Sequence, residues 1–134
     1  MRDTVEALLN LAREDLRAAH LTLDQGFVRV AISRAYYAAF HVAQAVLLTV
    51  GEQPGTHAGV SNRFYVHYVE TGRLPRDIGR LLPDALRQRN SADYDALTVF
   101  DTHAAADLIT EVETFVQAVE ALISSTPDEA PLHA

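Results

Sequence analysis

The stretch Phe27–Val50 constrains the fold more than any other part of the sequence, because a helix drawn through it is apolar around most of its circumference. Such a helix must have neighbours on nearly every side. Its most apolar part, residues 35–50, is interrupted by His41, Gln44 and Thr49, so it is too short and too polar to span a bilayer. We therefore predict a core helix at the centre of a bundle, with no membrane segment.

Apolar residues recur with a helical period in the rest of the chain, and no segment alternates apolar and polar residues as a strand would. Pro83 lies inside one such pattern and should kink its helix or restart it. We predict an all-α fold, an up-and-down bundle of four to five helices in a single domain over residues 1–124, followed by a disordered tail over residues 125–134. The predicted helices cover about residues 3–22, 27–50 and 57–70, a fourth from Pro75, and a fifth from Asp101 or Thr102 to about 123.

The composition excludes several kinds of chemistry. The 134 residues include no cysteine, which rules out disulfides, thiol catalysis and cysteine zinc sites. A net charge of −7 disfavours a broad, sequence-independent grip on nucleic acid, although a local basic cleft stays open. Acidic residues follow Met1 where a signal peptide would be apolar, so we expect neither secretion nor mitochondrial import, and a cytoplasmic location.

Neither a metal nor a cofactor is expected. No glutamate is followed three residues later by histidine, the pattern that di-iron bundles use. The series Gly51, Gly55 and Gly59 lacks the Lys-Ser/Thr ending and the preceding strand of a phosphate-binding loop.

A polar seam runs along the otherwise apolar core helix. Arg34, Tyr37 and His41 stand at positions i, i+3 and i+7, close enough for a string of hydrogen bonds along one face. The alternative is a thin strip that a central helix exposes to water. The residues within this narrow arc are Ser33, Arg34, Tyr37, His41 and Gln44.

A second polar group stands at 89–94, where a helical pattern ends. An arginine fork binds phosphate in bidentate fashion, and the Asp93-Tyr94 pair beside Arg89 could orient a ligand or handle a proton. The alternative is an Arg–Asp ion pair that closes a helix. His57 leaves a similar choice, between a functional role and that of a capping neighbour at a helix start.

Three segments together resemble a known family. Residues 33–41, 56–60 and 89–94, in this order and at this spacing, resemble the small stand-alone HEPN domain proteins of bacteria and archaea, over residues 5–123. The resemblance implies a bundle that commonly forms a homodimer, with the polar residues facing a shared cleft. Many members are toxins or defence ribonucleases, and many are encoded beside a minimal nucleotidyltransferase that acts as antitoxin.

The sequence departs from the family at one position of the ribonuclease motif. That motif is an arginine, often followed by Asn, and a histidine after four to six intervening residues; Arg89 and Asn90 match its first half, but no histidine follows at 94–96. A metal-independent ribonuclease needs a group that transfers protons near neutral pH, and His41 or His57 could supply it. The expected catalytic residues are Arg89, Asp93, Tyr94 and His41, and the expected nucleotide- or RNA-binding residues are Ser33, Arg34, Tyr37, Asn90 and His57.

Two classes of function follow from the resemblance. The first is a toxin directed at RNA or a nucleotide, with Arg89 on a phosphate. The second is a non-catalytic module that binds a nucleotide or docks a partner nucleotidyltransferase. Related toxins can be inactivated by nucleotidylation of a tyrosine near the motif, and the resemblance makes Tyr94 the candidate.

Overall fold

The computed structural model describes residues 1–125 of the chain. These residues form helices joined by turns, with no strand among them, which confirms the predicted all-α class. Residues 126–134, on which nearly all of the predicted disordered tail falls, lie outside the described residues. The elements are α1 (Arg2–Asp24), α2 (Val28–Leu48), α3 (His57–Phe64), the π-helix η1 (Tyr65–Val69), α4 (Arg76–Gly79), α5 (Leu81–Tyr94) and α6 (Thr102–Ser124).

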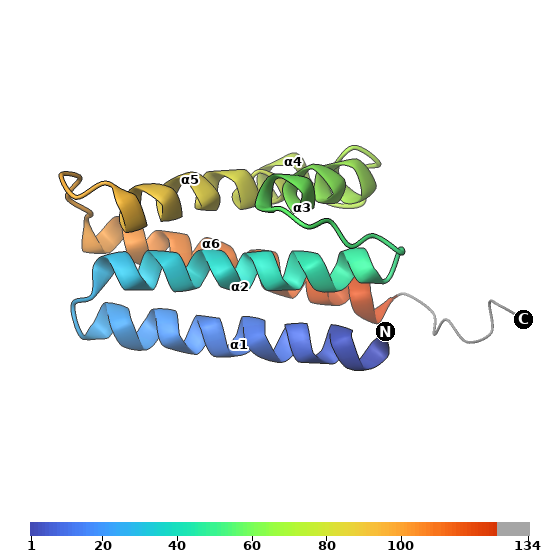
Figure 1. The fold of residues 1–134 in the computed structure, drawn as a ribbon, viewed down its shortest axis with the longest axis horizontal. Coiled ribbons are helices and arrows are strands. Elements are labelled where there is room, and N and C mark those ends of the chain that lie inside the picture. The colour runs from blue at the N-terminus through green and yellow to red at the C-terminus, as the bar shows by residue number, and fades with distance from the viewer. Residues whose placement is uncertain (126–134) are drawn as a thin grey trace, which may run out of the picture.

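The long helices alternate in direction along one axis, as in an up-and-down bundle (Figure 1). α2 lies at the centre and packs against α1, α5 and α6, and also against α3. Its buried positions are rich in alanine, which lets the neighbouring helices approach closely, while larger residues such as Ile32, Val42 and Leu47 fill the space between them. The predicted core helix is therefore confirmed. No helix within residues 1–125 has both the length and the apolar character needed to cross a bilayer.

Glycines and capping side chains set the ends of the long helices. Gly26 and Gly51 have φ values of 85° and 79°, a conformation that strains other residues and that ends α1 and α2. The side chains of Thr56 and Asp101 accept backbone N–H groups of the first turns of α3 and α6, at 2.9 and 3.0 Å. Glycine conformation and side-chain caps thus determine where these helices begin and end.

The helix predicted from Pro75 is two helices, α4 and α5, divided at Arg80. Pro83 lies in the first turn of α5, where proline fits because the N–H that it lacks needs no partner within the helix. It therefore marks a restart. α4 packs tightly on η1, since a Cβ added to Gly79 would lie 2.2 Å from Cγ2 of Val69. A larger residue at position 79 would push α4 away from η1.

Candidate functional site

The polar seam of α2 and the 89–94 segment of α5 lie side by side, joined at Tyr37. Nη2 of Arg89 donates a hydrogen bond to the Tyr37 phenol oxygen at 2.9 Å. The guanidinium of Arg89 also lies 5.3 Å from the centre of the Tyr37 ring, and that of Arg34 lies 4.9 Å from it. Two arginines from different helices thus meet at one aromatic ring.

Arg89 is held within its own helix as well. Its Nη1 donates to Oδ1 of Asn90 at 3.1 Å, and its Nε lies 2.8 Å from Oδ2 of Asp93 in an ion pair that is not aligned as a hydrogen bond. The Tyr94 ring lies 5.6 Å from the guanidinium and is 75% exposed. The ion pair that closes the helix is therefore present, together with the contact to α2.

A buried carboxylate from α1 joins two residues of the seam. Oδ1 of Asp15 accepts a hydrogen bond from Nη1 of Arg34 at 3.0 Å, and Oδ2 of Asp15 lies 2.7 Å from Nδ1 of His41. A carboxylate facing an arginine only accepts hydrogen bonds, so Nδ1 of His41 donates and Nε2 is left for another partner. We call these three residues the Asp15 cluster. The predicted string of hydrogen bonds within the seam is replaced by this link through α1.

His57 is held in a different state from His41. Burial raises the pKa of the Tyr36 phenol, which lies 2.7 Å from Nδ1 of His57. The pKa of His57 is lowered, first by burial and then by the positive charge of Arg89. Both shifts favour the neutral groups, and we assign the phenol as the donor to Nδ1, which leaves the ring proton on Nε2. His57 also packs on Phe40, with ring centres 4.5 Å apart.

Arg29 fixes the end of α5 against α2. Its Nη1 donates to the carbonyl of Ala92 at 2.8 Å, and its Nη2 donates to the carbonyl of Thr98 in the following loop. The guanidinium also lies 5.1 Å from the Phe100 ring. These contacts satisfy a carbonyl group at the C-terminus of the helix and hold the 89–94 segment in place.

All of the predicted site residues except Ser33 take part in the contacts described above, and the Ser33 side chain makes no hydrogen bond within residues 1–125. Sequence reasoning missed Asp15, Arg29 and Tyr36. Asp15 had a signal, because it interrupts the apolar stripe of α1 between Ala12 and Ala19. Arg29 and Tyr36 had no such signal, because the residues that they contact are distant in the sequence.

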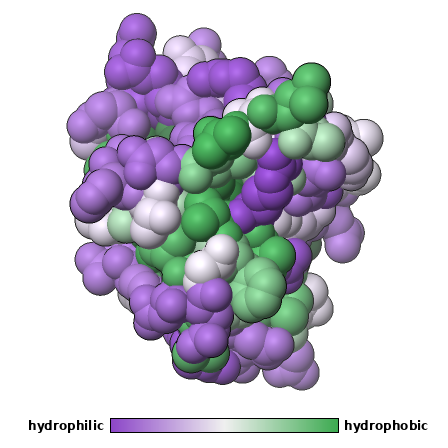
Figure 2. Space-filling model, turned by 90° about the vertical axis from the view of Figure 1, so that its left-hand side faces the viewer, coloured by the Kyte–Doolittle hydropathy of each residue, from purple (hydrophilic) through white to green (hydrophobic). Residues whose placement is uncertain are grey.

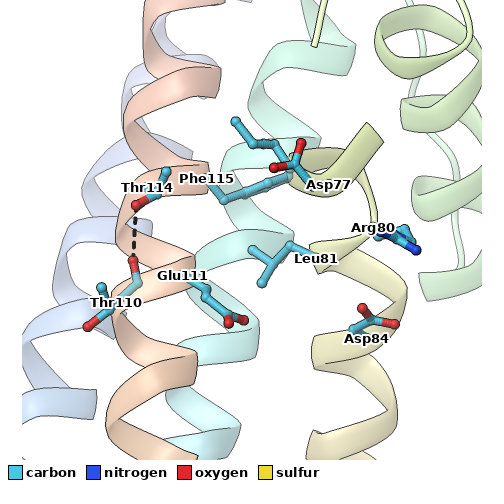
Figure 3. A pocket seen from close by; sticks show the side chains of 9 residues that line it. Asp77, Arg80, Leu81, Asp84, Thr110, Glu111, Thr114 and Phe115 are labelled. Atoms are coloured by element: carbon cyan, nitrogen blue, oxygen red, sulfur yellow. Dashed lines mark hydrogen bonds between the residues drawn. The ribbon is translucent and has the colours of Figure 1, made fainter. Parts of the chain in front are cut away.

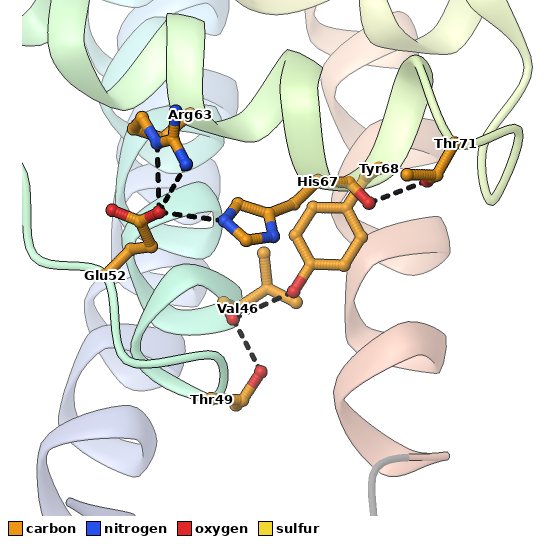
Figure 4. Close-up of polar contacts among 7 residues, drawn as sticks. All are labelled: Val46, Thr49, Glu52, Arg63, His67, Tyr68 and Thr71. Atoms are coloured by element: carbon orange, nitrogen blue, oxygen red, sulfur yellow. Dashed lines mark hydrogen bonds and ion pairs between the residues drawn. The ribbon is translucent and has the colours of Figure 1, made fainter.

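A second group of the same residue types lies beyond the C-terminal end of α2 (Figure 4). Oε2 of Glu52 accepts from Nε and Nη2 of Arg63 at 2.9 and 2.7 Å, and lies 2.9 Å from Nε2 of His67. We call these residues the Glu52 cluster. The pKa of Glu52 is lowered by the hydrogen bonds from His67 and Arg63. Among residues 1–125, no three His, Asp or Glu side chains are placed to hold a metal ion.

Apolar side chains gather at the end of the bundle where the α1–α2 and α5–α6 turns lie (Figure 2). Phe27 is 60% exposed, and Leu97 and Val99 are more than 90% exposed. We call these three residues the end patch. Leu97 and Val99 stand in the loop that follows the 89–94 segment, so part of the end patch is close in sequence to the polar site.

Comparison with known proteins links this geometry to a family. The family model of the HEPN domain matches residues 5–122 of the sequence. A protein named "Putative toxin" from Methanocaldococcus jannaschii is 35% identical over 120 residues, which cover 90% of this chain and 89% of that protein. Proteins named "UPF0332 protein" match as well: that of Thermotoga maritima is 34% identical over 112 residues (84% and 85% covered), and that of Gloeobacter violaceus is 39% identical over 87 residues (65% and 69%).

Proposed function

The chain belongs to the HEPN domain family, and from this premise we propose that it is a toxin that cleaves RNA without a metal, with Arg89 and Arg34 on the phosphate and His41 as the proton-transfer group. Toxin-like character is supported by the names of two relatives from Methanocaldococcus jannaschii. The chemistry is argued from the site.

The observation that carries the proposal is the contact between Asp15 and His41. The usual family motif places its histidine after the arginine, and this chain has none there. A buried carboxylate 2.7 Å from Nδ1 fixes the orientation of the His41 ring and leaves Nε2 free to accept a proton. His41 is 19% exposed at its side chain and contacts the Tyr37 ring, so it borders the surface that carries Arg89.

His57 is less suited to act as the base. Its Nδ1 already accepts the Tyr36 proton and its Nε2 carries a proton, so it offers a donor and no free lone pair. Its lowered pKa keeps it neutral. In the proposal His57 donates a hydrogen bond to a phosphate oxygen, beside Arg89.

The proposed reaction balances without a cofactor. Nε2 of His41 accepts the proton of a ribose 2′-hydroxyl, whose oxygen attacks the adjacent phosphorus, and the bond from phosphorus to the 5′ oxygen breaks. The proton then passes from His41, directly or through water, to the leaving 5′ oxygen. The products are a 2′,3′-cyclic phosphate and a 5′-hydroxyl. Arg89 and Arg34 stabilise the extra negative charge on the phosphate as it forms.

Cleavage of a labelled single-stranded RNA tests this proposal. We expect the wild type to produce 2′,3′-cyclic phosphate ends, and His41→Ala and Arg89→Ala to lower the rate by about 100-fold or more. His20→Ala is the matched control, because His20 of α1 pairs with Glu113 of α6, outside the site, and should leave the rate unchanged. No cleavage by the wild type, or full activity of His41→Ala, would refute the proposal.

We place Tyr94 as the residue through which a partner nucleotidyltransferase inactivates the toxin, as in related toxins. Its exposure of 75% supports access by another enzyme, and the nearby Arg89 could hold the transferred phosphate. After co-expression with the partner and ATP, the intact mass should rise by one or more nucleotidyl groups, and Tyr94→Phe should abolish this. An unchanged mass of the wild type would contradict this role.

The end patch favours a second candidate function, a non-catalytic module that docks a protein partner. Leu97 and Val99 stand almost fully exposed next to the site, and exposed apolar clusters mark interaction surfaces. A second copy of the chain is one such partner, as in the homodimers of the family. Growth arrest on expression that Arg89→Ala abolishes without loss of folding favours the toxin. A stable complex with a nucleotidyltransferase, without toxicity of the free protein, favours the module.

A further inference from the structure

A groove lies between the α3–η1 segment and the α4–α5 segment, separate from the Asp15 cluster. Its volume is about 410 Å³, within the range of pockets that bind small ligands. Ser61 and Tyr65 line one side, and Arg76, Arg80 and Pro83 line the other. We call it the α3–α4 groove. Its residues include none of the site described above.

The two arginines of the groove have no carboxylate partner. Arg76 and Arg80 are exposed, stand four positions apart, and make no ion pair or side-chain hydrogen bond with any of residues 1–125. In a chain of net charge −7, such a pair is a local positive charge that could attract an anion. Arg13, by contrast, faces a carboxylate, and so do Arg34, Arg63, Arg87 and Arg89.

A separate pocket lies between α4–α5 and α6. Three carboxylates line it, Asp77 and Asp84 of α4–α5 and Glu111 of α6 (Figure 3). Arg80 borders both pockets, and Figure 3 shows its guanidinium on the side of α5 away from α6. Of the two groove arginines, Arg80 therefore borders the acidic pocket as well, whereas Arg76 lines only the α3–α4 groove.

Tyr65 adds an aromatic face to this basic groove. It is the first residue of η1 and is 43% exposed, whereas Tyr68 of the same element is buried. An exposed tyrosine beside arginines is the pairing that single-stranded nucleic acid recognises, with a base on the ring and a phosphate on the guanidinium. π-helical turns are frequent at functional sites.

One wall of the groove lies on the helical segment that begins at His57. His57, Ser61 and Tyr65 recur every four residues along α3 and into η1, so they follow one side of it. Eight residues of helix span about 12 Å, the length of three or four stacked nucleotides at about 3.4 Å each. A strand with its reacting phosphate at Arg89 and His57 could therefore reach Tyr65 and the two arginines.

We propose that the α3–α4 groove is a second RNA-binding subsite, in which Arg76 and Arg80 hold a phosphate and Tyr65 stacks on a base a few nucleotides from the reacting bond. The choice of RNA as the ligand rests on the proposed function. The binding itself requires no catalysis, so the two ideas can fail separately.

Fluorescence anisotropy with a labelled eight-nucleotide uridine RNA, 2′-O-methylated so that it cannot be cleaved, tests the subsite. We expect Arg76→Ala/Arg80→Ala to weaken binding by tenfold or more and to reduce the salt dependence, by a slope of about 0.7 for each phosphate that the protein no longer neutralises. Tyr65→Ala should weaken binding by about fivefold or more, with little change in salt slope. Arg13→Ala/Arg17→Ala removes the same charge from α1 and should bind like the wild type; circular dichroism checks that each variant is folded.

The outcomes separate the two proposals. Unchanged binding by Arg76→Ala/Arg80→Ala refutes the subsite, even if His41→Ala abolishes cleavage. An equal weakening in Arg13→Ala/Arg17→Ala also refutes it, because the effect would then be one of net charge, and so does a wild type that does not bind the probe. Weaker binding confined to the groove variants supports the subsite, even if no RNA is cleaved and the ribonuclease proposal fails.

Discussion

The Asp15 and Glu52 clusters contain the same three residue types, a carboxylate, an arginine and a histidine, in two different arrangements. Each oxygen of Asp15 has its own partner, Arg34 or His41, and the carboxylate is 8% exposed. In the Glu52 cluster a single oxygen receives every contact, and the side chain is 27% exposed.

The two clusters also differ in what they connect. One nitrogen of each histidine contacts the carboxylate, but only the Asp15 cluster is connected to Arg89, through the Tyr37 ring. The Glu52 cluster ties the loop after α2 to α3 and η1, which is a structural task (Figure 4). Identical residue types therefore do not distinguish the two clusters; the burial of the carboxylate and the connection through Tyr37 to Arg89 do.

The largest expected difference between the clusters is in RNA cleavage. Asp15→Asn should lower the rate by about 100-fold, because the amide can donate to Nδ1 and so place the His41 proton on Nε2. The pH dependence of the cleavage rate should change as well, because Asp15 would no longer determine which nitrogen of His41 carries the proton. Glu52→Gln is the matched control and should keep the wild-type rate. Equal reductions in both variants, or none in Asp15→Asn, would remove the distinction.

Stability should separate the clusters next. Asp15→Ala leaves Arg34 and His41 without their buried partner and should lower the free energy of unfolding by about 3 kcal/mol. Glu52→Ala acts at a more exposed carboxylate and should cost less. Urea denaturation of the two variants beside the wild type measures this. A larger destabilisation by Glu52→Ala would mean that the Glu52 cluster contributes more to the stability of the fold than the Asp15 cluster does.

The tyrosines beside the clusters give a smaller and opposite pair of effects. Tyr37→Phe removes the acceptor of the Arg89 hydrogen bond and should slow cleavage by about fivefold to tenfold, the equivalent of about 1 kcal/mol, with little change in stability. Tyr68→Phe removes a buried hydrogen bond of 3.1 Å to the Val46 carbonyl and should cost about 1 kcal/mol of stability without affecting the rate. A slower rate in Tyr68→Phe with a loss of stability in Tyr37→Phe would contradict the assignment of the Asp15 cluster to the reaction and of the Glu52 cluster to the fold.

The smallest effect expected is on acid stability. The pKa of Glu52 in the fold is below its value in the unfolded chain, so its contribution is present above the ordinary pKa of 4.5 and is lost as pH falls through the folded pKa. The thermal midpoints of the wild type and Glu52→Gln should therefore differ at neutral pH and converge in acid. A constant difference at every pH would show that the charge of Glu52 is not involved.

Much of the fold follows from local patterns in the sequence, but the site follows only in part. The apolar circumference of Phe27–Val50 predicted the central helix, and Pro83 predicted a kink or a restart, of which the structure has the restart, at Arg80. The seam and the 89–94 segment were both identified, yet no local pattern indicated the Arg89–Tyr37 contact, which joins residues 52 positions apart.

Asp15 is the most important site residue that the sequence did not predict. A charged residue within an apolar stripe requires a partner for its charge. The partners of Asp15 lie on another helix, so the pattern shows that a partner must exist but not which residue it is. The π-helical turn after Phe64 also had no signal, because Tyr65–Val69 has the composition of an ordinary helix. Both features depend on packing between elements, which a single sequence does not reveal.

Because α2 packs against α1, α3, α5 and α6, no one of these helices can detach and leave the middle of α2 in water while the others stay in place. The amide protons around Ala39 and Val42 should then exchange with solvent only when the whole bundle unfolds, and those of α3 and α4 much sooner. The polar seam lies on this slowest-exchanging helix. Tyr37 and His41 should therefore be held on the most protected helix, whereas α3 and α4, which border the α3–α4 groove, should be less protected.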